Sequence, residues 1–148
     1  MRFLLKLNFY VQEYQGKIKV IAFCILPNHF HFVLFEPEFK AGLGGREKSQ
    51  IPEFMHRLQT SYAMYFSIKY KDLIKPGLKM PVFEGRYRSK VIIKEKYLIS
   101  VVNYVEYNAV RHEIVDSVYD WPYSSFDCEK PEESMSMEDV FDEFEFYF

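Results

Sequence analysis

Two apolar runs separated by a two-residue turn constrain the fold of this chain more than any other feature. Residues 17–26, KIKVIAFCIL, and residues 29–36, HFHFVLFE, are rich in β-branched and aromatic side chains, which favour strands. Pro27 and Asn28 stand between them, and both residue types favour turns. Because so short a connection joins neighbouring antiparallel strands, the pattern predicts a β-hairpin.

Helical periodicity dominates the rest of the chain. It is clearest in residues 51–70, where apolar side chains recur every three or four positions and form one stripe. Similar periodicity predicts helices at 2–15, before Gly16, and at 95–112. The other expected segments are a loop at 37–50, a linker around 76–81, a third strand at 88–94 and a turn-rich segment at 120–126. This order predicts an α+β fold with a small, mainly antiparallel sheet.

A pair of histidines, His29 and His31, begins the second strand of the expected hairpin. Side chains at i and i+2 of a strand share a face, so the two imidazoles would stand side by side, with Phe30 and Phe32 turned away. Two neutral imidazoles held in this way can bind one divalent metal ion. The alternative interpretation is a pair of half-buried strand residues, and the spacing alone is weak evidence for a metal site.

One flank of the expected helix at 95–112 carries polar groups suited to chemistry. Tyr104 and Asn108 are four residues apart and share a face, and Tyr97 and Arg111 lie near them. A tyrosine on a helix flank is more often a packing residue than a reactive one. The buried stripe of the same helix is expected to be Leu98, Val102, Val105 and Ala109.

Charge is distributed unevenly along the 148 residues, although the net charge is only −2. Residues 127–148 contain nine acidic residues and one lysine, a net charge of −8, so residues 1–126 have a net charge of +6. We therefore expect one domain at 1–126, followed by an acidic tail at 127–148. A basic body is compatible with nucleic-acid binding, although an ordinary solvated surface explains it equally well.

Composition excludes several other classes of protein. We expect neither a membrane span nor a signal peptide, since no apolar run approaches 18 residues and the first residues lack a small-residue cleavage site. Two cysteines, Cys24 and Cys128, are too few for a disulfide framework or a cysteine-rich zinc site. A reducing, cytoplasmic location fits this composition.

Four blocks in order resemble a known family. The block LPNHFHFVLF is similar to the His-hydrophobic-His motif of the HUH superfamily of single-tyrosine nucleases, and the chain more narrowly resembles the REP-associated tyrosine transposases. The narrower resemblance rests on CILPNHFHFVLF, FMHRLQTSYAMYF, VFEGRYRSKVI and YLISVVNYVEYNAVRHEIV followed by DWPYSSF, which cover most of residues 20–126. It implies a ferredoxin-like sheet with helices.

The resemblance also implies roles for individual residues. His29 and His31 match the family's metal-binding histidines, Asn108 matches the position that completes the metal site, and Tyr104 matches the nucleophile. The cofactor would be Mg²⁺ or Mn²⁺. The candidates for DNA contacts, with Tyr87 for base stacking, are Arg57, Arg86, Tyr87, Arg88, Lys90 and Arg111.

A single-tyrosine transposase cleaves and rejoins DNA strands through a 5′-phosphotyrosine intermediate. The resemblance therefore implies single-stranded or hairpin DNA as the partner, of the kind formed by repetitive extragenic palindromes. We expect the protein to act as a monomer or a homodimer and not to have a membrane as a partner.

The chain departs from the family pattern at three places. Ala109 replaces a usual proline, Glu106 stands where histidine is common, and the strand that normally precedes the first helix is absent before the hairpin. The last departure leaves open an inactive remnant that only binds DNA hairpins. A histidine-triad nucleotide hydrolase is a further alternative, but Val33 occupies the position of its third histidine.

Overall fold

The structure is a computed structural model that describes residues 2–39, 48–72 and 81–126. The chain divides into two compact units, one formed by Met1–Ile18 and Glu38–Ser89 and the other by Lys19–Pro37 and Lys90–Phe148. The described residues contain one two-stranded antiparallel sheet and four α-helices, so the predicted α+β class is confirmed.

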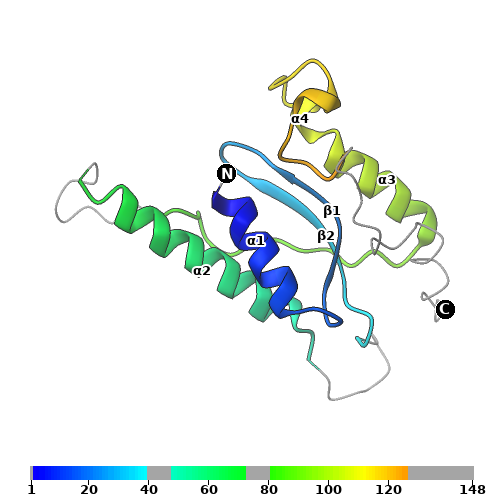
Figure 1. The fold of residues 1–148 in the computed structure, drawn as a ribbon. Helices are drawn as coiled ribbons and strands as arrows, with labels where there is room; N and C mark the ends of the chain where they lie inside the picture. Colours follow the sequence, from blue (N-terminus) through cyan, green and yellow to red (C-terminus); the bar gives the residue numbers. More distant parts are fainter. Residues whose placement is uncertain (1, 40–47, 73–80, 127–148) are drawn as a thin grey trace. The chain divides into compact units, whose positions relative to one another are not determined.

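The first unit is built on two helices, α1 at Arg2–Glu13 and α2 at Ile51–Lys69. They run in opposite directions side by side (Figure 1), since Phe3 contacts Tyr62 near one end of the pair and Tyr14 contacts Phe54 near the other. Both helices were expected. The first ends at Glu13 rather than at residue 15, and Gly16 follows with a φ of 79°, which a residue with a Cβ rarely adopts. The buried side chains of the two helices are Phe3, Leu7, Phe54, Met55 and Leu58.

The second unit contains the predicted hairpin, formed by β1 at Lys19–Ile25 and β2 at Phe30–Phe35. The strands pair antiparallel, with Cys24 opposite His31 and Ala22 opposite Val33. The amide of Leu26 donates to the carbonyl of His29 at 2.8 Å and closes the turn around Pro27 and Asn28. His29 therefore belongs to the turn, one residue before the strand begins.

Helix α3, at Glu95–Glu106, lies along one face of this hairpin (Figure 1). The predicted stripe faces the sheet: Leu98, Val105 and Ala109 are buried in the shared core, and Val102 packs against it. The hairpin contributes four buried side chains to the same core: Ala22, Cys24 and Val33 from the strands and Leu26 from the start of the turn. The face of β2 that carries Val33 is therefore the face covered by the helix.

The expectation of one continuous helix at 95–112 is wrong. Helix α3 ends at Glu106, and a separate turn of helix, α4, follows at Asn108–Arg111 after Tyr107. The carbonyl of Tyr104 accepts a hydrogen bond from the side-chain Nδ2 of Asn108 at 2.7 Å, at the point where the helix breaks. Asparagine side chains that bond to a nearby carbonyl in this way compete with the helical ladder.

The expectation of a third strand at 88–94 is also wrong, because these residues have an irregular conformation. Buried and exposed side chains do alternate here, since Ile92 packs on the core while Val91 and Ile93 are exposed. A strand also needs a neighbouring strand to which its backbone can hydrogen-bond, and alternation does not supply one. The free side of β1 pairs instead with the turn-rich segment at 120–126. Ile25 donates to the carbonyl of Tyr123 at 2.8 Å, and Ser125 donates to that of Phe23 at 2.9 Å.

The segment at 120–126 is preceded by a short 3₁₀ helix, η1, at Val118–Asp120. The other expected segments fall partly outside the described residues: 40–47 of the loop, 76–80 of the linker and the whole tail at 127–148, which includes Cys128. In the part of the chain that is described, none of the helices combines the length and apolar character needed to cross a membrane.

Candidate active site

The hairpin turn brings the two predicted histidines to the face covered by α3. His29, His31 and Val33 are at i, i+2 and i+4, and Val33 is buried beneath the helix, so the histidines continue the same face toward the turn. Their rings contact edge to face with centroids 5.0 Å apart. Phe30 and Phe32 stack on each other with centroids 4.8 Å apart, as alternation requires for the opposite face.

The turn also fixes the protonation pattern of one of these rings. The Nδ1 of His29 lies 2.7 Å from the side-chain Oδ1 of Asn28. A carboxamide oxygen can only accept, so this contact is a hydrogen bond in the tautomer that carries its proton on Nδ1, in which Nε2 keeps its lone pair. Histidines that bind metals usually have their second nitrogen held in this way. Asn28 is therefore a positioning residue that the sequence analysis did not include among the site residues.

Helix α3 brings Tyr104 to the histidine pair. The ring of Tyr104 contacts that of His31 edge to face, with centroids 5.8 Å apart, and the Cζ of Arg111 lies 4.9 Å from the centroid of the tyrosine ring. The two neighbouring tyrosines lie elsewhere: Tyr107 packs on Phe126, and Tyr97 contacts Lys96. Of the three tyrosines on this part of the chain, Tyr104 is therefore the one that faces the histidines.

Two buried atoms at this site have lone pairs and no hydrogen-bond partner among the described residues, namely Nε2 of His31 and Oδ1 of Asn108. Asn108 is fully buried, and its Nδ2 is occupied by the carbonyls of Tyr104 and Val105. Leaving a buried acceptor unsatisfied costs roughly 1–3 kcal/mol, so such atoms call for an explanation. An imidazole nitrogen and an amide oxygen can both bind divalent metal ions.

A third histidine, His112, was not identified from the sequence. Its ring contacts that of His29 with centroids 5.0 Å apart. Although these rings touch, no three His, Cys, Asp or Glu side chains within the described ranges are grouped as a metal-ligand set. His112 is four residues after Asn108, and residues at this spacing in a helix share a face, so the sequence did contain a signal for this histidine.

The surroundings keep the histidine pair neutral. Burial lowers the pKa of His31, and the proximity of His29 and His112 lowers it further. Burial also lowers the pKa of His29, with a contribution from His112. Since only a neutral imidazole offers a lone pair to a metal ion, both shifts favour the ligating form at neutral pH.

Glu106, where the related family often has histidine, has a partner at the edge of the sheet. Its Oε1 accepts a hydrogen bond from the hydroxyl of Ser125 at 2.8 Å, and that hydroxyl accepts from the amide of Phe23 at 3.0 Å. Trp121 donates from Nε1 to the carbonyl of Ile25 at 3.1 Å. Glu106 and Trp121 therefore help to hold the segment at 120–126 against β1.

The six candidates for DNA contacts are divided between the two units. Arg111 lies at the site, and the exposed Lys90 belongs to the same unit. The remaining four lie in the first unit: Arg57, Arg86, Tyr87 and Arg88. The guanidinium of Arg57 is 3.1 Å from the carboxylate of Glu13, so this arginine already has an anionic partner.

Fold and site together define an α+β protein in which a tyrosine of α3 meets two histidines of a hairpin, with a buried carboxamide at the start of α4. The sequence is 27% identical over 126 residues to a Haemophilus influenzae protein whose curated name provisionally assigns it to the REP-associated tyrosine transposases. The alignment covers 79% of this chain and 69% of that protein, so the resemblance indicated by the four blocks extends over most of the sequence. No family model matches the chain, and no solved structure gives a significant match.

Proposed function

We propose that this protein is a REP-associated tyrosine transposase that cleaves and rejoins single-stranded or hairpin DNA through Tyr104. The observation that supports this proposal best is the contact between Tyr104 and His31, beside two buried, unpartnered ligand atoms. The similarity to the Haemophilus influenzae protein supports the transposase class and DNA as the partner.

His29, His31 and Asn108 would hold the metal, Mg²⁺ or Mn²⁺. When bound, the metal supplies positive charge that polarises the scissile phosphate. The protein's own contribution is to present neutral imidazoles and an oriented amide oxygen. Asn28 holds the ring of His29, and the carbonyl of Tyr104 holds the amide of Asn108.

Tyr104 would attack the phosphorus through its phenolic oxygen. The new bond joins this oxygen to phosphorus, the bond to the 3′ oxygen of the preceding nucleotide breaks, and the phenolic proton is lost while the leaving oxygen gains one. The products are a 5′-phosphotyrosine and a free 3′-hydroxyl. The guanidinium of Arg111, close to the tyrosine ring, can stabilise negative charge on the phenolic oxygen and on the phosphate. Attack by another 3′-hydroxyl reverses the step and joins a new strand.

The test is to trap the covalent adduct. The full chain is incubated with labelled single-stranded hairpin DNA and Mn²⁺, and the modified peptide is mapped. Tyr104→Phe removes one oxygen and keeps the ring, so this variant should bind DNA and form no adduct. Tyr107→Phe is a matched control, because the two tyrosines are 44% and 43% exposed but only Tyr104 contacts His31.

Two results would overturn this assignment. One is an adduct on Tyr107 or Tyr97, and the other is full activity of Tyr104→Phe. Tight DNA binding without any adduct in the unmutated protein would instead support the remnant that only binds hairpins.

A further inference from the structure

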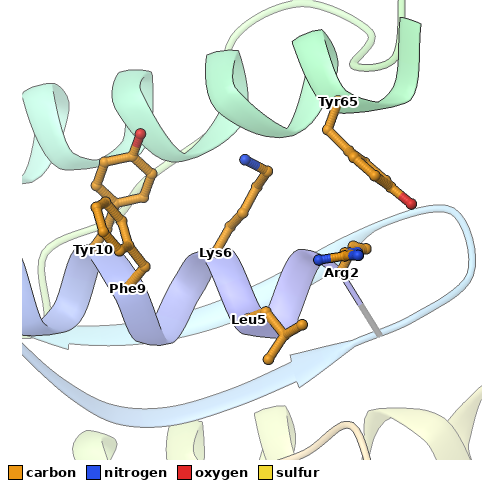
Figure 2. Close-up of a pocket in the computed structure, with 6 residues that line it drawn as sticks. All are labelled: Arg2, Leu5, Lys6, Phe9, Tyr10 and Tyr65. Atoms are coloured by element: carbon orange, nitrogen blue, oxygen red, sulfur yellow. The ribbon is translucent and has the colours of Figure 1, made fainter. Parts of the chain in front are cut away.

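A second cluster of basic and aromatic side chains lies in the first unit and plays no part in the proposed chemistry. It surrounds a cleft of about 290 Å³ between α1 and α2, shown in Figure 2. Six residues line this cleft: Arg2, Leu5, Lys6, Phe9, Tyr10 and Tyr65. At this volume, close to the lower limit of small-molecule sites, the cleft suits a group of the size of one nucleobase.

Positive charge gathers around the ring of Tyr65 at one end of the cleft. The Cζ of Arg2 lies 5.6 Å from the centroid of this ring, and the Nζ of Lys69 lies 5.7 Å from it. Hydrogen bonding by Lys69, with a smaller contribution from Arg2, lowers the pKa of Tyr65. Figure 2 shows Lys6 between Arg2 and Tyr10, with its ammonium group directed toward α2. Three cations are thus available along one side of the helix pair.

Acidic side chains of the same two helices lie away from this end. Glu13, at the last position of α1, is 3.1 Å from Arg57. Glu53 lies in the first turn of α2, whereas Tyr65 and Lys69 are in its last turns. Lys71 and Asp72 follow the end of α2 and offset each other in charge. The three cations beside the cleft therefore have no nearby acidic partner on α1 or α2.

Exposed apolar surface lies beside these cations. Leu5 is 58% exposed and Phe9 is 57% exposed, and both line the cleft. Phe9 contacts Tyr10 edge to face, with centroids 5.2 Å apart. Aromatic rings beside lysine and arginine are the features by which proteins bind single-stranded nucleic acid, through base stacking and phosphate contacts.

We propose that this cleft binds one unpaired nucleotide of the DNA substrate, with its base on the ring of Tyr65 and neighbouring phosphates on Arg2, Lys6 and Lys69. The proposal rests on DNA being the substrate of the proposed function, but it concerns a different unit of the chain. A duplex cannot enter in this way, because its bases are paired and stacked. The cleft would thus favour single-stranded over double-stranded DNA.

The experiment measures the affinity of the full chain for a short oligothymidine that contains one 2-aminopurine. Fluorescence anisotropy is recorded with a chelator present, so that binding is separated from cleavage, and at several salt concentrations. Lys6→Gln should lower the slope of log K against log salt by about 0.7, the contribution of one phosphate contact to a single strand. Lys17→Gln is the matched control, since Lys17 is an exposed lysine of the same unit beyond the other end of α1.

The aromatic contact is tested with a pair of substitutions. Tyr65→Leu keeps a good helix former but removes the ring, and it should weaken binding by about 5- to 150-fold and reduce the quenching of 2-aminopurine. Tyr65→Phe keeps the ring and should retain both. Circular dichroism of each variant confirms that it is folded.

The proposal is overturned if Lys6→Gln matches Lys17→Gln and Tyr65→Leu binds as the unmutated protein does, or if the chain binds no single-stranded DNA at all. The adduct on Tyr104 distinguishes this outcome from failure of the proposed function. Adduct formation with unaltered binding by these variants would leave the function intact and reject the cleft. Weakened binding by Lys6→Gln and Tyr65→Leu without any adduct would support the cleft and reject the nuclease.

Discussion

Replacing Asn108 with leucine should leave the metal-free protein stable and remove its response to metal. The side chain is fully buried, so leucine, which is similar in size and apolar, can occupy the same space. The substitution removes an amide oxygen that has no partner within the described structure. It also removes the hydrogen bond of 2.7 Å from Nδ2 to the carbonyl of Tyr104. These two changes have opposite effects on the free energy of unfolding.

Their magnitudes determine the expected range. Losing one neutral hydrogen bond destabilises a protein by about 0.5–1.5 kcal/mol, and removing an unsatisfied buried acceptor relieves about 1–3 kcal/mol. The metal-free Asn108→Leu variant should therefore lie between about 0.5 kcal/mol less stable and about 2.5 kcal/mol more stable than the unmutated protein. Metal at 100 times its dissociation constant should stabilise the unmutated protein by about 2.7 kcal/mol and leave the leucine variant unchanged.

The assay is denaturant unfolding with and without Mn²⁺. Asn108→Asp is the informative control, because it retains an oxygen ligand but places a carboxylate in a buried position. Without metal this carboxylate is unpaired and should destabilise the protein, whereas metal should stabilise this variant most of all. The argument fails if Asn108→Leu responds to metal as the unmutated protein does. It also fails if metal-free Asn108→Leu loses more than about 3 kcal/mol, since the oxygen would then have had a partner.

Three further outcomes are expected. His29→Ala and His31→Ala should each abolish metal-dependent nicking but retain most of the DNA affinity measured by anisotropy, because affinity is spread over many phosphate contacts. Nicking by either variant would exclude that histidine as an essential ligand. Deleting the acidic residues 127–148 should tighten DNA binding at low salt and have no effect at high salt, since exposed charges are screened over about 8–10 Å. Unchanged affinity at low salt would show that the tail does not compete with DNA. Glu113 has a φ of 54°, a conformation that glycine adopts more readily than residues with a Cβ. Glu113→Gly should therefore raise the free energy of unfolding in chemical denaturation by about 0.5–1 kcal/mol, whereas Glu113→Ala should not. Equal effects of the two substitutions would mean that φ is not the cause.

Local sequence was sufficient to predict the hairpin and the helices α1 and α2. In the hairpin, strand propensity, a Pro-Asn turn and alternation all indicate the same structure, and each depends on neighbouring residues. The helices α1 and α2 likewise follow from periodicity, and Gly16 provides the stop. The His29 and His31 pair could be placed on one face for the same reason, because alternation along a strand is independent of the rest of the fold.

Features that depend on distant partners could not be predicted in this way. Residues 88–94 have the alternation of a strand, but a strand also needs an edge to pair with, and the edge of β1 is taken by residues 123–125. The contact between His112 and His29 depends on how the end of the helix packs over the turn. Neither Ser125 nor Glu106 has a local signal for the hydrogen bond that joins them.

The carboxamide of Asn108 lies at the break in the helix and belongs to the proposed metal site. A backbone carbonyl can only accept, so the bond to the carbonyl of Tyr104 must come from Nδ2. With Nδ2 bonded to the helix backbone, Oδ1 is the atom of the carboxamide that is buried without a partner among the described residues. Since the bonded carbonyl belongs to Tyr104, the proposed ligand and the proposed nucleophile are held relative to each other by one short hydrogen bond.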